Sequence, residues 1–304
     1  MLELKNIKKI NCEIDKLQND LTKEKKVSVS MLRLDKIDRE ISGNKLFKLY
    51  YFLQEAITSN KKIITFGGAY SNHLAATAGA CKAYGINCIG IVRGEEPKVF
   101  SHTLIFCKQK GMHLEFISRK NYKRKDEEGF KKDLTKKYGE HILVPEGGFS
   151  KEGADGASLI SKLYTKKNYT HVCCSVGTAT TIAGLIISSD KVQQIIGFSA
   201  LKNITDFEKR IKYLLKDYTC KNYCLINGYD FGGYAKKNDK LISFINKFYE
   251  EFATPIDFVY TAKMMFGVFD MIQKNYFKKQ SKILCIHSGG LQGNLSLPTG
   301  TLNF

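Results

Sequence analysis

The residues with the clearest chemical potential are two lysines near the start of a predicted helix. Lys45 and Lys48 lie one helical turn apart, and apolar residues recur at helical spacing from Leu46 to Ala56. An amine becomes a nucleophile when it loses its proton, and burial or a neighbouring cation favours that loss. Lys45 is therefore a candidate for attack on the aldehyde of a cofactor. The simpler alternative for such a pair is a solvated helix face.

A glycine-opened polar loop follows the next predicted strand. It reads Gly67-Gly68-Ala69-Tyr70-Ser71-Asn72-His73, and an alanine-rich helix is predicted from His73 to Gly85, because glycine often ends a helix. The loop would bring polar side chains close to the lysines.

The strongest independent signal is the segment from Gly177 to Thr181, which lies between an apolar strand and an apolar helix. Small side chains at a helix N-terminus leave backbone N–H groups free to bind a phosphate group. The segment lacks the lysine of a nucleotide-binding loop and the three glycines of a dinucleotide fingerprint, which disfavours an ATPase or a dehydrogenase. A threonine-rich helix cap is the alternative.

Polar residues also end the last predicted strand, at His287-Ser288-Gly289-Gly290. The carboxyl ends of parallel strands meet at one edge of a sheet, so Ser288 should face the same crevice as the phosphate segment. We expect His287 to be packed rather than catalytic. Tyr234 lies among glycines, which favours a position at a site, whereas Tyr260 is one of 16 tyrosines with no such signal.

Short apolar runs alternate with segments of helical period, which predicts an α/β protein with a mostly parallel sheet. The predicted strands are 63–66, 88–92, 113–117, 142–144, 171–174, 195–198 and 282–286. Because no linker divides the chain, we expect intertwined domains. The larger would contain residues 1–55 and 158–304, and the smaller would be an inserted α/β unit at residues 56–157.

Composition places the 304-residue chain, which is 43% hydrophobic, among globular proteins. Its apolar runs are shorter than a membrane span, its first residues lack a signal core, and we expect a cytoplasmic protein without membrane contact. The nine cysteines have no metal-site spacing, Cys220 and Cys224 included, so we expect reduced thiols and no metal. The net charge of +18 is spread along the chain without a recognition motif, which disfavours a specific nucleic-acid partner.

Together, these motifs resemble the family of 1-aminocyclopropane-1-carboxylate deaminase and D-cysteine desulfhydrase. The resemblance extends from about residue 31 to residue 290 and rests on Gly43-Asn44-Lys45 with Lys48-Leu49, Gly67 to His73, Gly177 to Thr181, Val259-Tyr260-Thr261 with Lys263, and His287 to Gly290. That family belongs to the tryptophan synthase β-like enzymes of fold type II, which depend on pyridoxal 5'-phosphate. The resemblance implies that cofactor, two intertwined three-layer domains, a small amino-acid substrate and a homodimer.

The resemblance also implies roles for individual residues. Lys45 matches the Schiff-base lysine, and Asn72 matches the partner of the cofactor's ring hydroxyl. The hydroxyl of Thr261 or of Ser288 would meet the cofactor's ring nitrogen. The residues that match the phosphate cradle are Gly177, Thr178, Ala179, Thr180 and Thr181, with alanine at 179 where the family more often has glycine. The residues that match catalytic or substrate-binding positions are Ser71, Asn72, His73, Tyr234 and Tyr260.

Three departures separate this chain from the family's deaminases, which carry Glu, Leu and Gln where it has Thr261, Ser288 and His73. All three resemble the desulfhydrases. We therefore expect β-elimination of the D-cysteine desulfhydrase kind, giving a 2-oxo acid, ammonia and sulfide. The alternative is a 1-aminocyclopropane-1-carboxylate deaminase giving 2-oxobutanoate and ammonia. A racemase or another lyase, a non-catalytic cofactor or amino-acid sensor, and a polyanion binder also remain open.

Overall fold

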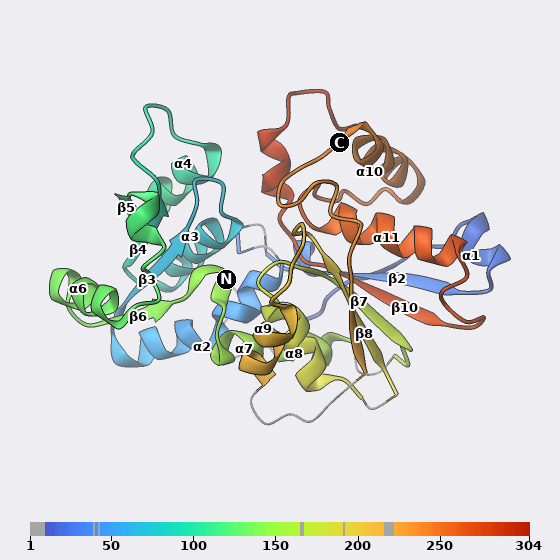
Figure 1. Ribbon diagram of the computed structural model, residues 1–304, viewed down its shortest axis with the longest axis horizontal. Helices are drawn as coiled ribbons and strands as arrows, with labels where there is room; N and C mark the ends of the chain where they lie inside the picture. The colour runs from blue at the N-terminus through green and yellow to red at the C-terminus, as the bar shows by residue number, and fades with distance from the viewer. Residues whose placement is uncertain (1–9, 39, 42, 165–166, 191, 216–221) are drawn as a thin grey trace.

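The computed structural model describes residues 10–304 except 39, 42, 165–166, 191 and 216–221. It contains two sheets (Figure 1). The six-stranded sheet has the order β1-β2-β10-β7-β8-β9, formed by Ile14–Lys16, Ser28–Arg33, Lys282–His287, His171–Val176, Gln194–Ser199 and Tyr223–Ile226. The four-stranded sheet has the order β5-β4-β3-β6, formed by His113–Ile117, Cys88–Arg93, Lys62–Gly67 and His141–Val144. Every pairing is parallel except that of β1 with β2.

Helices cover both faces of each sheet. On the larger sheet, one face carries α1 (Asp20–Glu24), α10 (Asp239–Phe252) and α11 (Thr261–Gln273), and the other carries α7 (Lys151–Ser158), α8 (Thr180–Ser188) and α9 (Phe207–Leu215) (Figure 1). On the smaller sheet, one face carries α3 (Asn72–Tyr84) and α4 (His102–Gln109), and the other carries α5 (Arg119–Tyr122) and α6 (Glu128–Tyr138). Short 3-10 turns are η2 (Leu34–Lys36), η3 (Glu146–Gly148), η4 (Leu159–Leu163) and η5 (Leu291–Ser296). The predicted three-layer α/β architecture is confirmed.

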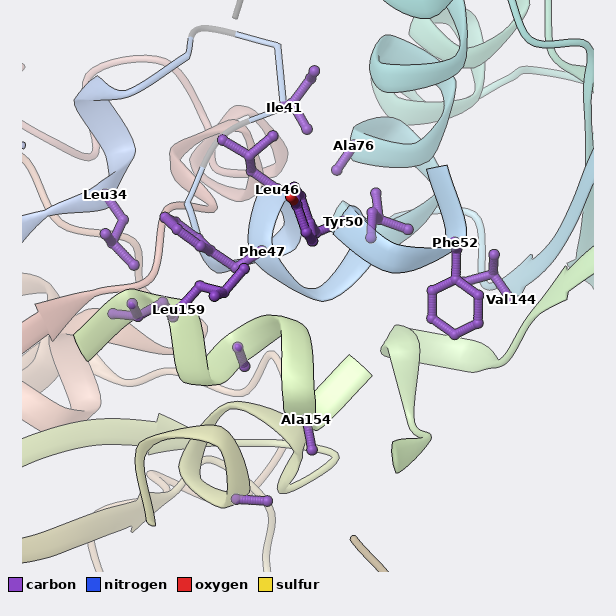
Figure 2. Close-up of a cluster of buried hydrophobic side chains, with 14 of the residues drawn as sticks. Leu34, Ile41, Leu46, Phe47, Tyr50, Phe52, Ala76, Val144, Ala154 and Leu159 are labelled. Carbon is purple, nitrogen blue, oxygen red and sulfur yellow. The ribbon is translucent and has the colours of Figure 1, made fainter. Parts of the chain in front are cut away.

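Helix α2 (Asn44–Ser59) packs against elements of both sheets. Figure 2 shows Leu46, Phe47 and Phe52 leaving the helix in different directions, toward side chains that include Leu34, Ile41, Val144 and Leu159. Leu46 and Phe47 are at most 1% exposed. Burying each large apolar side chain stabilises the fold by about 1.5–3 kcal/mol, so the start of α2, where Lys45 lies, is firmly placed.

All seven predicted strands are present, and so are the two predicted helices, although most of these elements extend one to three residues further than expected. The strands β1, β2 and β9 were not predicted. The four strands of the smaller sheet lie between residues 62 and 144, within the predicted inserted unit. The boundaries at 55/56 and 157/158 fall inside α2 and α7 and stay predictions.

The described cysteines are all free thiols. Cys220 and the first residues of the chain, for which no signal core was predicted, lie outside the described part. Within that part, no helix is long and apolar enough to span a membrane. Nor do its His, Cys, Asp and Glu side chains form a group of three or more that could hold a metal ion.

Candidate active site

A cavity of about 470 Å³ lies where the carboxyl ends of strands from both sheets meet the starts of α2, α3 and α8. Such a volume is typical of a site for a small ligand. The structure brings every sequence-predicted site residue to its wall: Lys45, Ser71, Asn72, His73, Gly177, Thr178, Ala179, Thr180, Thr181, Tyr234, Tyr260 and Ser288. Their individual roles stay predictions.

The start of α2 is tied to the two polar segments of the larger sheet. The backbone N–H of Asn44 donates to the carbonyl of Ser288 at 3.1 Å, and its side-chain amide donates to the hydroxyl of Thr181 at 2.7 Å. Gly43, the residue before the helix, has a φ of +75°, and a Cβ there would lie 1.9 Å from the carbonyl oxygen of Ser288. Only glycine therefore fits this junction, which fixes Lys45 relative to the ends of β7 and β10.

Both lysines are held in a state that favours the neutral amine. Burial lowers the pKa of Lys45 to about 8, against the opposing attraction of Asp257. Burial, and then the charge of Lys45, lowers the pKa of Lys48 to about 7. Lys48 also donates to the carbonyl of Gly147 at 3.1 Å. The Lys45 amine lies 5.6 Å from the ring centre of Tyr260. Because its pKa is lowered to about 8, part of the Lys45 amine is neutral near neutral pH and can act as a nucleophile.

His73 is held as a neutral imidazole with one free acceptor. Burial, followed by the charges of Lys48 and Lys45, lowers the pKa of His73 to about 3. The hydroxyl of Thr65 donates its single hydrogen to the carbonyl of Val144 at 2.9 Å and lies 2.8 Å from His73 Nε2. That nitrogen must then carry the hydrogen, which leaves a lone pair on Nδ1. A side chain in this state accepts hydrogen bonds through Nδ1 and does not bind a carboxylate there.

The two tyrosines of the wall form a pair. The rings of Tyr234 and Tyr260 lie edge to face, with their centres 6.0 Å apart. Burial raises the pKa of Tyr234, and burial followed by the neighbouring Tyr234 raises the pKa of Tyr260 well above its ordinary value. Both hydroxyls therefore keep their protons at neutral pH and can serve as acids but not as bases.

The segment from Gly177 to Thr181, which is predicted to bind a phosphate group, leads into α8 without a side-chain cap on the helix. Ala179, the residue before the helix, has the left-handed φ of +68°, and the hydroxyls of Thr178 and Thr180 lie 3.0 Å apart. Since no side chain occupies the first N–H groups of α8, they remain available to an anion. At Gly177, a Cβ would lie 3.2 Å from the ring of Tyr260, so a larger residue there would press against that ring.

Several buried polar atoms of the wall lack a partner in the described part of the chain. They are Asn44 Oδ1, Asn72 Oδ1, His73 Nδ1 and Ser175 Oγ. Buried polar groups are normally hydrogen-bonded. These atoms therefore fit a site that is completed by a polar ligand.

His287 is packed, as predicted. The backbone N–H of Gly289 donates to its Nδ1 at 3.2 Å, and its Nε2 donates to the carbonyl of Pro255 at 2.9 Å. Both ring nitrogens are thus used, and the side chain is buried. Thr261 is also buried, and it is not among the described residues that line the cavity, whereas Ser288 is.

Sequence reasoning missed several residues of the wall: Asn44, Arg93, Glu146, Ser175 and Arg210. Glu146 had a usable signal, because it follows a predicted strand and precedes two glycines. Arg210, whose guanidinium donates to the carbonyl of Gly177 at 3.2 Å, lies inside a helix where no local pattern marks it.

Comparisons with known proteins agree with this geometry. No family model matches the chain. It is 28% identical over 270 residues to a provisionally named 1-aminocyclopropane-1-carboxylate deaminase of Thermotoga maritima, covering 83% of this chain and 85% of that protein. It is 26% identical over 281 residues to the mitochondrial bifunctional D-cysteine desulfhydrase/1-aminocyclopropane-1-carboxylate deaminase of Arabidopsis thaliana, covering 84% and 70%. The resemblance to this enzyme family is confirmed.

Solved structures confirm the predicted fold. A structure described as an ACC deaminase homologue matches with a TM-score of 0.78 and 24% identity, covering 93% of this chain and 90% of that one. Threonine deaminase isoform 2 from Solanum lycopersicum matches with a TM-score of 0.66 and 17% identity, covering 92% and 79%. The chain therefore has the tryptophan synthase β-like fold of the deaminase and desulfhydrase family.

Proposed function

We propose that this protein is a pyridoxal-phosphate-dependent lyase that eliminates a β-substituent from a small amino acid, with D-cysteine as the preferred substrate. The observation that carries the proposal is the position of Lys45. Its amine, with a pKa lowered to about 8, lies in one cavity with the uncapped N-terminus of α8. An aldehyde and a phosphate group on one molecule would find both partners there.

The cavity offers a partner for each polar part of that cofactor. We assign its phosphate to the segment from Gly177 to Thr181, its ring hydroxyl to Asn72 and its ring nitrogen to Ser288. The unpartnered Oδ1 of Asn72 and the free N–H groups of α8 support this assignment. When bound, pyridoxal phosphate supplies an aldehyde that captures an amine and a ring that accepts electrons from the α-carbon.

The protein's own residues would divide the proton transfers between them. Lys45, once released from the cofactor, acts as the base at the α-carbon, because its lowered pKa leaves a neutral amine near pH 8. Tyr234 and Tyr260 keep their protons and can donate one to the departing thiolate. The hydroxyl of Ser71 accepts the N–H of Leu74 at 3.2 Å, so its hydrogen remains free for the substrate.

The assignment gives His73 a narrower role than the resemblance implies. Its free Nδ1 can accept a hydrogen bond from an N–H or S–H group of the substrate, so the substrate carboxylate falls to Ser71 and Asn72. Loss of the α-proton and of the β-thiol, followed by addition of water, gives a 2-oxo acid, ammonia and sulfide.

The acidic residues near the cavity favour the desulfhydrase over the deaminase. Among the described residues of the wall, Glu146 alone is acidic, and it lies 3.7 Å from the amine of Lys125. The nearby carboxylate of Asp257 already accepts backbone N–H groups of residues 259, 260 and 261. With Thr261 where the deaminases carry Glu, we infer that the ring nitrogen meets a neutral hydroxyl. That arrangement suits elimination of a thiol better than opening of a cyclopropane ring.

Absorbance spectroscopy with product analysis tests the proposal. Purified wild type should show a visible band with pyridoxal phosphate that shifts when D-cysteine is added, and sulfide and ammonia should appear in equal amounts. Lys45→Ala should lose both the band and turnover, because Lys48, the other amine among the described residues of the wall, is engaged by the carbonyl of Gly147 at 3.1 Å. Release of 2-oxobutanoate from 1-aminocyclopropane-1-carboxylate, without activity on D-cysteine, would establish the alternative. A cytoplasmic location and a homodimer stay predictions.

A further inference from the structure

Lys263 is a buried cation that the proposed chemistry does not use. It lies on α11 and is 1% exposed. Its amine donates to the carbonyl of Asp230 at 2.7 Å and to the carbonyl of Gly233 at 2.6 Å. Both acceptors belong to one segment, residues 228–235, which we call the Tyr234 loop. The side chain therefore joins helix α11 to this loop.

The Tyr234 loop has a backbone that needs outside support. Positive φ angles occur at Gly228, Phe231, Gly232, Gly233 and Ala235, and two of these residues are not glycine. Left-handed backbone is unfavourable for residues with a Cβ and persists only when the surroundings hold it. The N–H of Gly233 bonds the carbonyl of Asp230, so the loop forms one turn within itself. Lys263 bonds both ends of that turn.

The start of α11 and the residues just before it contact both tyrosines of the cavity. Tyr260 immediately precedes the helix, and the carboxylate of Asp257 fixes its backbone N–H at 2.8 Å. Lys263, one turn further, holds the loop that carries Tyr234, whose ring contacts Tyr260. Lys263 thus contributes to the position of one tyrosine relative to the other, beside the hydrogen bond from Tyr229 to Asp270 and the contact of the Phe231 ring with Phe266, which also join this loop to α11.

We propose that Lys263 is a positioning residue, which holds the Tyr234 loop against α11 and thereby places Tyr234 in the cavity wall. The effect on substrate rests on the proposed function, whereas the effect on the loop does not. Lys263 acts through backbone carbonyls, so the identity of the loop side chains matters less than the presence of a donor at the end of the lysine side chain.

Limited trypsin cleavage tests the loop directly, because the exposed Lys236 and Lys237 immediately follow it. Lys263→Met keeps the side-chain volume and removes the donors. We expect cleavage at these two lysines to become at least tenfold faster, since both charged hydrogen bonds of the lysine to the loop are lost. The matched control is Lys240→Met, because Lys240 is exposed and lies over the ring of Phe266. Its cleavage rate should equal that of wild type, and equal rates in all three proteins would overturn the proposal.

A double-mutant cycle with Tyr234→Ala tests the link to substrate. Lys263→Met should raise KM for D-cysteine and leave the cofactor band in place. In the Tyr234→Ala background it should have no further effect on kcat/KM beyond about twofold, because the tyrosine it positions is gone. Additive losses would overturn the role through Tyr234. If Lys263→Met fails to fold, Lys263→Gln takes its place in the assay, because its amide keeps N–H donors on a neutral side chain. Cleavage of that variant at the wild-type rate would mean that the amide still reaches both carbonyls and holds the loop. Should wild type prove inactive on D-cysteine, the cleavage rates still decide the loop inference.

Discussion

The two walls of the cavity are built in different ways. On one wall, Lys45, the segment from Gly177 to Thr181 and Ser288 lie at the ends of regular elements, joined by hydrogen bonds of Asn44. On the other wall, Tyr234 lies on a loop that helix α11 holds through Lys263. The fold itself thus places the residues that we assign to the cofactor, whereas the loop that carries Tyr234 can change without changing the fold.

Gly43→Ala should have the largest effect, because it breaks the rigid wall. The new methyl group would need a left-handed backbone and would collide with the carbonyl of Ser288. We expect the free energy of unfolding to fall by about 3 kcal/mol or more, measured by urea denaturation. Gly111→Ala is the control, since Gly111 has a φ of +85° with open space around it. It should cost only about 1 kcal/mol. Equal losses would show that the junction between α2 and β10 is not tightly packed.

The pH dependence of cofactor capture should reveal how the same wall prepares Lys45. Only the neutral amine attacks, and burial lowers the pKa of Lys45 from 10.5 to about 8. The rate of capture by the cofactor-free protein should therefore rise about tenfold per pH unit below pH 8 and level off above it. Stopped-flow absorbance between pH 6 and pH 10 measures the profile. A rate that kept rising to pH 10 would mean that Lys45 behaves as an ordinary lysine.

Thr65→Val should slow catalysis, because Thr65 contacts His73 in the part of the cavity formed by α3. The change keeps the shape of the side chain but removes the oxygen that fixes the hydrogen on His73 Nε2. We expect kcat/KM to fall about tenfold, with ¹⁵N NMR showing a mixture of His73 tautomers. Thr65→Ser keeps the hydroxyl and should stay within about twofold of wild type. If Thr65→Val left both the tautomer and the rate unchanged, the hydroxyl would not control His73.

Ala179→Gly should have the smallest effect. Glycine relieves the left-handed backbone at the phosphate segment but adds freedom to the unfolded chain, and the two effects nearly cancel. The expected gain in unfolding free energy is below about 1 kcal/mol, by thermal denaturation. Ala253→Gly, at an exposed left-handed position after α10, is the control and should behave alike. A clear loss of stability only at 179 would show that the buried methyl group packs usefully in the wall.

Local patterns predicted the parts of the fold that are buried on both faces. Strands β3, β4, β7 and β8 read as apolar runs because helices cover both sides of them. The edge strand β9 was missed although its four residues, Tyr223–Ile226, are all apolar, because the pattern of so short a run does not distinguish a strand from part of a helix. β2 was missed because Ser28 and Ser30 interrupt its apolar run.

The site could be predicted only as far as its chemistry is local. Lys45 and the phosphate segment stand in recognisable stretches, whereas the roles of Asn72 and His73 came from the family resemblance. The tautomer of His73 depends on Thr65 and on Val144, which lies on another strand. Lys263 was noticed within a motif, but its partners are backbone carbonyls some thirty residues earlier, which no spacing in the sequence indicates.

The order of the strands also determines when the protein can become reactive during synthesis. β10, the last strand of the chain, lies in the interior of the larger sheet between β2 and β7, and Ser288 at its end anchors the helix of Lys45. Chains emerge from the ribosome N-terminus first, so nearly the whole chain must be made before this lysine is enclosed. Until then its amine is exposed and protonated, and it captures few aldehydes. The late strand therefore delays the reactivity of Lys45 until the rest of the protein is in place.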